Sequence, residues 1–227
     1  MSTAIAEQTK TRRQILAPRP RVVLHPVSWA TYLQLSNEAM DHSHVRMIYD
    51  RGRLEIVSPL PPHERYKYVL GRFVDNVLVG LRIPFEAAGE SRWLREAAAR
   101  GLEADETFFI NFEKMEIVGG RPAGRPDDPL PDLAIEVDIS DHAADRMKVY
   151  AALGIPELWT YDGDQLRIFQ LQANSTYEEI AASRFLPISS QEIAEWVEKV
   201  DGVNLLDWIE SLQVWIREEL VPRWANR

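Results

Sequence analysis

Two short apolar segments each carry an acidic residue at one end. Asp105 opens the segment 105–110, and Glu136 lies near the end of the segment 131–138. An unpaired ionised carboxylate is costly to bury on a core strand. A divalent metal would offset that cost, because Mg²⁺ takes oxygen ligands and often uses only one or two carboxylates plus phosphate oxygens. The pattern therefore predicts a metal-dependent phosphodiesterase site.

The order of these residues suggests how one metal ion could be shared. Asp105 begins its strand, whereas Glu136 lies 31 residues later, near the end of another strand. If the two strands run antiparallel, both carboxylates meet at one end of the sheet. They could then bind Mg²⁺ or Mn²⁺, with the carbonyl of Val137 as a further ligand. A lysine could orient the attacking water or steady the developing charge, and the candidates are Lys148 and Lys67.

Periodicity and turn signals define the elements that must position these residues. Residues 133–137 are apolar on both faces, as in a central strand covered on both sides. A long helix is expected over about 63–81, because its apolar residues recur at helical spacing. The other expected helices are 28–40, 143–153, 190–199 and 205–220, and the other expected strands are 45–49, 54–57, 85–88, 91–95, 157–161, 165–171 and 176–181. This order predicts a mixed α/β sheet with helices on its faces.

Composition limits the class of protein. The chain has 227 residues, no Cys and a net charge of −9. The absence of Cys excludes a disulfide framework or a thiolate zinc site and fits a reducing, cytoplasmic setting. No apolar run reaches the ~18 residues of a membrane span. The acidic balance argues against a large cationic surface for nucleic acid, although a small basic patch can coexist with it.

Several spaced segments carry a resemblance to a known family. They are Tyr49-Asp50-Arg51-Gly52-Arg53-Leu54-Glu55-Ile56-Val57-Ser58-Pro59, His63-Glu64, Gly101-Leu102-Glu103-Ala104-Asp105-Glu106, residues 131–138, and Gly154-Ile155-Pro156-Glu157-Leu158-Trp159. In this order, over roughly residues 26–190, the chain resembles the Uma-two family of the PD-(D/E)XK nuclease superfamily. The resemblance implies a restriction-endonuclease-like core, Mg²⁺ dependence and phosphodiester hydrolysis.

The resemblance also assigns positions to individual residues. It puts Asp105 at the superfamily's Asp position and Glu136 at its Asp/Glu position, and Glu64 falls where many members carry a helix-borne carboxylate. Asp138 stands where the superfamily places Lys, so Lys148 on the next helix becomes the carried-over lysine. A second departure is Ala104, where the family usually has Pro, which affects the strand entry more than the chemistry.

Each candidate also has a purely structural interpretation. Asp105 and Glu136 could be bound to Arg or to backbone amides instead of a metal. Lys148 could pair with Asp145, three residues earlier, and Glu64 could simply favour the dipole of its helix. Asp138 could be a third ligand or a solvated strand end.

The remaining polar residues favour structural roles. Asp132 is expected to cap or position the loop before its strand. His63 is expected to be a helix cap or a surface residue. His42 and His44 have the alternating spacing of a metal pair on a strand, but no third ligand matches them.

The sequence thus predicts three regions. Residues 1–21 form a disordered basic arm, 22–188 a restriction-endonuclease-like domain, and 189–227 C-terminal helices packed on the core or at a dimer interface. The favoured function is a Mg²⁺-dependent endonuclease acting on DNA as a homodimer, with Asp105, Glu136, Lys148 and the accessory Glu64 as catalytic residues. The alternative is a protein that keeps the nuclease fold for binding without turnover.

Overall fold

The computed structural model describes residues 21–39, 45–58, 61–125, 127–137 and 143–226. The basic arm up to residue 20, the pair His42 and His44, and Asp138 lie outside these residues. Expectations about them therefore stay predictions.

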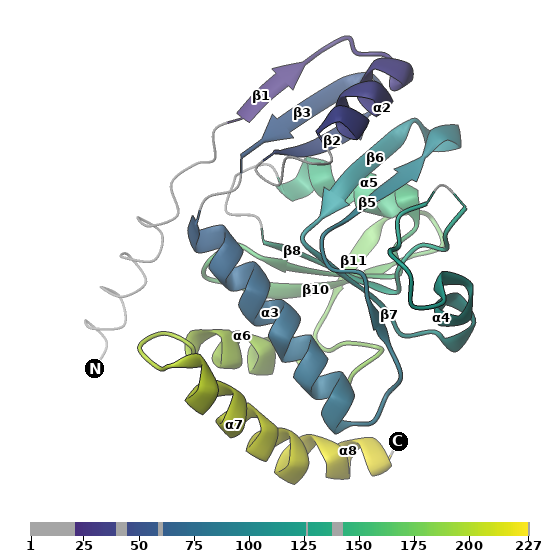
Figure 1. The fold of residues 1–227 in the computed structure, drawn as a ribbon. Helices are drawn as coiled ribbons and strands as arrows, with labels where there is room; N and C mark the ends of the chain where they lie inside the picture. Colours follow the sequence, from purple (N-terminus) through teal and green to yellow (C-terminus); the bar gives the residue numbers. More distant parts are fainter. Residues whose placement is uncertain (1–20, 40–44, 59–60, 126, 138–142, 227) are drawn as a thin grey trace.

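Two sheets form the centre of the fold (Figure 1). The first sheet is antiparallel, in the order β1 (Arg21–Leu24), β3 (Arg53–Val57), β2 (Arg46–Asp50), β6 (Arg100–Ala104) and β5 (Ser91–Arg95). The second is mixed, in the order β11 (Tyr177–Ile180), β10 (Leu166–Leu171), β9 (Glu157–Tyr161), β8 (Leu133–Val137), β7 (Glu106–Phe109) and β4 (Glu86–Ala87). This confirms a mixed α/β, restriction-endonuclease-like fold, although one sheet had been expected instead of two.

Between β6 and β7, the chain passes from the first sheet to the second at a single residue. Strand β6 ends at Ala104 and strand β7 begins at Glu106, so Asp105 occupies the bend between the sheets. Strand β7 runs antiparallel to β8, with Glu106 opposite Ile135, and β8 runs parallel to β9. If the β7–β8 pairing is extended by one residue beyond Glu106 and Ile135, Asp105 lies opposite Glu136. The predicted antiparallel arrangement is thus present.

Local sequence explains the elements that were predicted correctly. The turn between β2 and β3 has Arg51 and Gly52 at positive φ (45° and 95°), which matches a type I′ hairpin turn. Helix α2 (Trp29–Glu38) begins after Ser28, whose side chain accepts a hydrogen bond from the amide of Thr31 at 3.1 Å. Helix α5 (Ala143–Leu153) ends before Gly154, at φ 92°.

Strand β1 and helix α4 are among the elements that had not been predicted. Strand β1 extends the first sheet by pairing with β3. Helix α4 (Phe112–Val118) is short but well capped, since the Asn111 side chain accepts hydrogen bonds from the amides of Glu113 and Lys114. Its seven residues give too few turns for a clear helical period.

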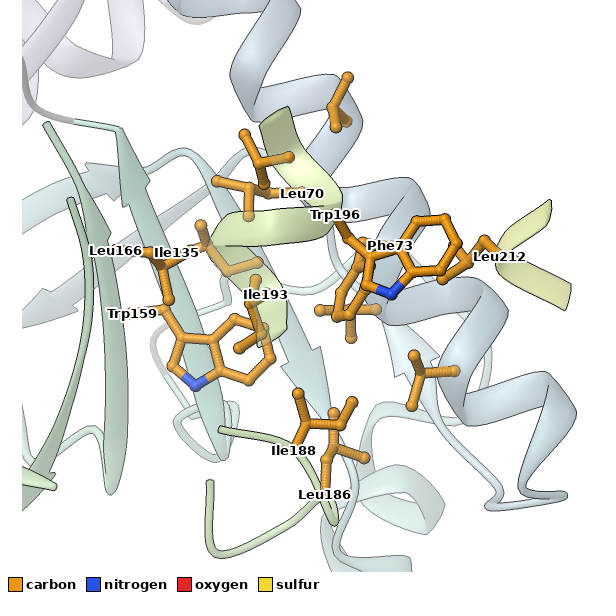
Figure 2. Packing of buried hydrophobic residues seen from close by; sticks show 14 of the residues in the cluster. Leu70, Phe73, Ile135, Trp159, Leu166, Leu186, Ile188, Ile193, Trp196 and Leu212 are labelled. Carbon is orange, nitrogen blue, oxygen red and sulfur yellow. The ribbon is translucent and has the colours of Figure 1, made fainter. Parts of the chain in front are cut away.

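The main core lies between the second sheet and the helices on one of its faces. Figure 2 shows Ile135, Trp159 and Leu166 of the sheet facing Ile193 and Trp196 of helix α6 (Ser190–Glu198). Helices α3 (Pro61–Gly80) and α7 (Leu205–Trp215) extend this core. A π-helical turn, Ile216–Leu220, and helix α8 (Val221–Ala225) close the chain.

The apolar stripe of α7 faces this core. Trp208, Leu212 and Ile216 are at most 2% exposed and pack in the same cluster as Phe73 of α3. Packing on the core was one of the two interpretations of the stripe, and it leaves these residues unable to form a subunit interface.

Candidate active site

Asp105 is fully buried and is held from three directions. Its Oδ2 accepts a hydrogen bond from the amide of Val137 at 2.6 Å, and His63 Nε2 lies 2.9 Å from the same oxygen. Its Oδ1 forms an ion pair with the guanidinium of Arg46 on β2. The Val137 contact follows from the β7–β8 register, which brings the start of one strand to the end of the other.

His63 connects two carboxylates at the start of α3. Its Nε2 faces Asp105, and its Nδ1 lies 3.0 Å from Oε1 of Glu64. A neutral imidazole can donate from only one nitrogen, so two carboxylate acceptors favour the cationic ring. The side chain is fully buried. His63 therefore orients Asp105 from the core and is not the surface residue that had been expected.

Glu64 lies at the solvent-facing side of this group. It contacts His63, Lys67 at 3.0 Å and Arg46 at 3.5 Å. The hydrogen bond from His63, followed by Lys67 and Arg46 and opposed by partial burial, lowers the pKa of Glu64 to about 2. Glu64 is thus ionised at neutral pH, one contact away from Asp105.

Glu136 has its own cation, which comes from helix α5. Arg146 Nη1 donates to its Oε1 at 2.5 Å, and the Tyr150 hydroxyl donates to its Oε2 at 2.7 Å. Burial, and then the charge of Glu136, raises the pKa of Tyr150 well above its usual value, so the phenol keeps the proton that it donates. Arg146 also lies 3.6 Å from Glu55 of β3, which ties α5 to both sheets.

Lys148 does not share this position. Its side chain is 67% exposed, and its Nζ lies 2.9 Å from Oδ1 of Asp145, the structural pairing considered for it. Lys67, the other candidate lysine, contacts Glu64 and, at 2.7 Å, Glu90. The cations that bind the two central carboxylates are Arg46 and Arg146, so both acids have the arginine partners that the structural interpretation of the sequence allowed.

A signal for Arg146 is nevertheless present in the sequence. Arg146, Val149, Tyr150 and Leu153 follow the i, i+3, i+4, i+7 spacing of one helix face, and all four are buried. An arginine within an apolar stripe needs a buried acid as partner, and Glu136 was the obvious one. Lys148 lies off this stripe. For Arg46 we find no comparable signal, since its acidic partners Glu64, Glu90 and Asp105 come from three distant parts of the chain.

Asp132 belongs to a separate structural network. Its Oδ2 accepts hydrogen bonds from the amides of Ile110 and Asn111 at 2.8 and 2.7 Å, and Lys114 pairs with its Oδ1 at 2.5 Å. These contacts fix the loop between β7 and α4. Its contacts are therefore those of a loop-positioning residue.

The donor chemistry of the central pair suits a hard cation. Asp105 and Glu136 offer carboxylate oxygens from opposed register positions, and Mg²⁺ often needs only one or two protein carboxylates. Within the described residues, no three Asp, Glu or His side chains are grouped as a complete metal site. A metal here would have to share Asp105 with Arg46 and Glu136 with Arg146.

The two-sheet fold and the opposed acidic pair define a protein of the restriction-endonuclease-like class. A family model described as "Putative restriction endonuclease", Uma2, matches residues 29–200. The chain therefore belongs to the Uma2 (Uma-two) family, within the PD-(D/E)XK superfamily. No curated protein matches the chain.

Proposed function

We propose that this protein is a divalent-metal-dependent nuclease that hydrolyses phosphodiester bonds, with DNA as substrate. The observation that carries the proposal is the antiparallel β7–β8 register, which sets Asp105 opposite Glu136 in a chain of the Uma2 family. Family membership supports a nuclease. Magnesium (or manganese) and DNA are the finer part of the proposal.

Asp105 and Glu136, with the carbonyl of Val137, would hold the metal. When bound, such an ion polarises the phosphate and lowers the pKa of a coordinated water. Neighbouring residues of the protein hold these two carboxylates in place by hydrogen bonds. His63 and the Val137 amide fix Asp105, whereas Tyr150 and Arg146 fix Glu136.

Two further residues have accessory roles in this proposal. Glu64 is an accessory carboxylate, ionised and one contact from Asp105 through His63. Lys148 would assist catalysis only by reaching inward from its exposed pairing with Asp145. Arg146 already supplies a fixed positive charge at Glu136, which can stabilise charge that develops on a phosphate.

Plasmid cleavage in Mg²⁺ or Mn²⁺ tests this function. Asp105→Ala and Glu136→Ala should each lower the rate at least ~100-fold, as for loss of a group that stabilises transition-state charge. The control is Glu116→Ala, an exposed acid on α4, which should cleave like the native chain. Unchanged cleavage in both site variants would show that the site is wrong.

A specific observation favours the second candidate, a nuclease fold that binds a partner without turnover. Both central carboxylates are already neutralised by arginines, which removes the electrostatic need for a metal. Calorimetry separates the two functions: heat of Mg²⁺ or Mn²⁺ binding at millimolar concentration, lost in Asp105→Ala, supports the nuclease. The absence of any such heat, with partner binding intact, supports the binding protein.

A further inference from the structure

A pocket lies beside the candidate site, between the β2–β3 turn and the first half of α5. Its walls include Arg51 of the turn, Arg53 at the start of β3, and Arg146 and Lys148 of the helix. Its volume is about 140 Å³. One water needs only ~10–15 Å³, so the pocket has room for a phosphate group.

The pocket shares a residue with the candidate site. Arg146 lines the pocket and also donates to Glu136 at 2.5 Å. A group in the pocket therefore lies one side chain from the proposed metal carboxylate. Phosphates on one nucleic-acid strand follow each other every ~3.4 Å of helix axis, so neighbours of a phosphate at Glu136 fall within reach.

The cations of the pocket differ in how firmly they are held. Arg146 is 5% exposed and bound between Glu136 and Glu55, so it stays in place. Arg51 and Lys148 are each 67% exposed, and among the described residues each pairs with one nearby acid, Asp50 and Asp145 respectively. Exposed pairs of this kind are worth ~0–1 kcal/mol, so exchanging the acid for a phosphate costs little.

The charge balance of this pocket also differs from that of the whole chain. Four cations face three acids, Asp50, Glu55 and Asp145, in a protein with a net charge of −9. A polyanion approaching an acidic molecule is bound where cations gather next to the reacting group.

We propose that this pocket is an anion subsite that binds a backbone phosphate flanking the scissile one, with Arg51 and Lys148 as its exchangeable contacts. The inference rests on the proposed nuclease function and deepens it. It also gives Lys148 a different role, in substrate binding instead of activation of water.

The test compares two double variants of the full chain that change the net charge equally. Arg51→Ala/Lys148→Ala removes the rim of the pocket. The control, Arg65→Ala/Arg167→Ala, removes two exposed cations that do not line the pocket. Arg65 donates a hydrogen bond to the carbonyl of Val200, and Arg167 lies on β10. Binding of a short DNA duplex is measured by fluorescence anisotropy without divalent ions, over a range of salt concentrations.

The pocket variant should bind the duplex at least ~10-fold more weakly, and its salt slope should fall by about 1, because the single phosphate contact that is lost contributes ~0.9. The control variant should bind like the native chain. Equal binding by all three proteins, equal loss in both variants, or no duplex binding by the native chain would overturn the proposal. Plasmid cleavage by Asp105→Ala reports separately on the nuclease, so either idea can fail alone.

Discussion

At the scale of single residues, the site is a set of buried carboxylates, each matched by a cation from a different element. Asp105 has Arg46 and His63, and Glu136 has Arg146. Removing one partner of a buried ion pair leaves an uncompensated charge, which costs much more than the pair itself contributes. These residues are therefore sensitive points for stability as well as for chemistry.

Arg146 and Lys148 provide a matched comparison on one helix. Arg146→Ala leaves Glu136 and Glu55 without their guanidinium and should lower the free energy of unfolding by about 3–5 kcal/mol. Lys148→Ala removes an exposed pair and should cost less than ~1 kcal/mol. Urea unfolding measures both. Similar losses in the two variants would contradict the buried role of Arg146.

Glu103 of β6 should make the stability of the protein depend on pH. Burial, opposed by the hydrogen bond from the Met47 amide, raises the pKa of Glu103 from about 4.5 to about 7. The folded state holds this proton more tightly than the unfolded state does. The stabilisation from protonated Glu103 is therefore full below pH 4.5 and is lost as pH rises through 7.

Glutamine does not titrate, so the Glu103→Gln variant should not lose this stability as pH rises. Its stability relative to the native chain should be about 2 kcal/mol more favourable at pH 8 than at pH 5, from ~1.4 kcal/mol per pKa unit. Thermal or urea unfolding at both values measures it, with the exposed Glu116→Gln as control. A pH-independent difference would show that Glu103 titrates normally.

At the scale of elements, the site depends on how the first sheet is packed. Helix α2 covers that sheet through Tyr32, which is fully buried and stacks on Tyr49 of β2 with ring centroids 4.8 Å apart. Gly101 of β6 makes this approach possible. A Cβ at that position would lie 2.5 Å from the Tyr32 hydroxyl and 2.7 Å from Leu94 Cδ2.

Gly101→Ala should therefore push α2 away from the sheet and destabilise the protein by about 1–3 kcal/mol, as expected of overpacking. The melting temperature measures the effect, with Glu96→Ala at an exposed neighbouring position as control. A melting temperature equal to that of the native chain would mean that Tyr32 and Leu94 move aside at no cost.

At the scale of the whole molecule, the termini of the described chain lie on different sides of the fold (Figure 1). None of the described helices is both long and apolar enough to cross a membrane. The homodimer stays a prediction. Because the α7 stripe is used by the core, the interface would need another surface, such as the groove that Val79 and Val221 line.

Val79 is 66% exposed and is a direct probe of that groove. Light scattering of the native chain should give the mass of a dimer, and Val79→Glu should shift it to a monomer, because an interface cannot bury an unpaired charge cheaply. Phe112→Glu, at a 62% exposed position on α4, is the control. A native monomer at high concentration would contradict the homodimer.

The sequence by itself determined the elements and the central acidic pair. Apolar periodicity, caps and turn residues are local, so most helices and strands, including the β2–β3 hairpin and α5, could be predicted close to their observed bounds. The apolar segments placed Asp105 at the start of one strand and Glu136 near the end of another, and the family motifs marked both as site residues. The antiparallel pairing that brings them together was only a condition, which the structure meets with Asp105 in the bend just before β7.

Only the tertiary structure decided which cations serve those carboxylates. Arg46 and His63 reach Asp105 from β2 and α3, and these contacts depend on how separate elements pack, which spacing along one chain does not encode. For Arg146, the spacing of α5 indicates burial, and the packing of α5 brings it to Glu136. The same reason applies to the division into two sheets at Asp105. Lys148 has the charge that was expected for the site. However, the face of α5 that carries Arg146 and Tyr150 is buried, and Lys148 is exposed to solvent.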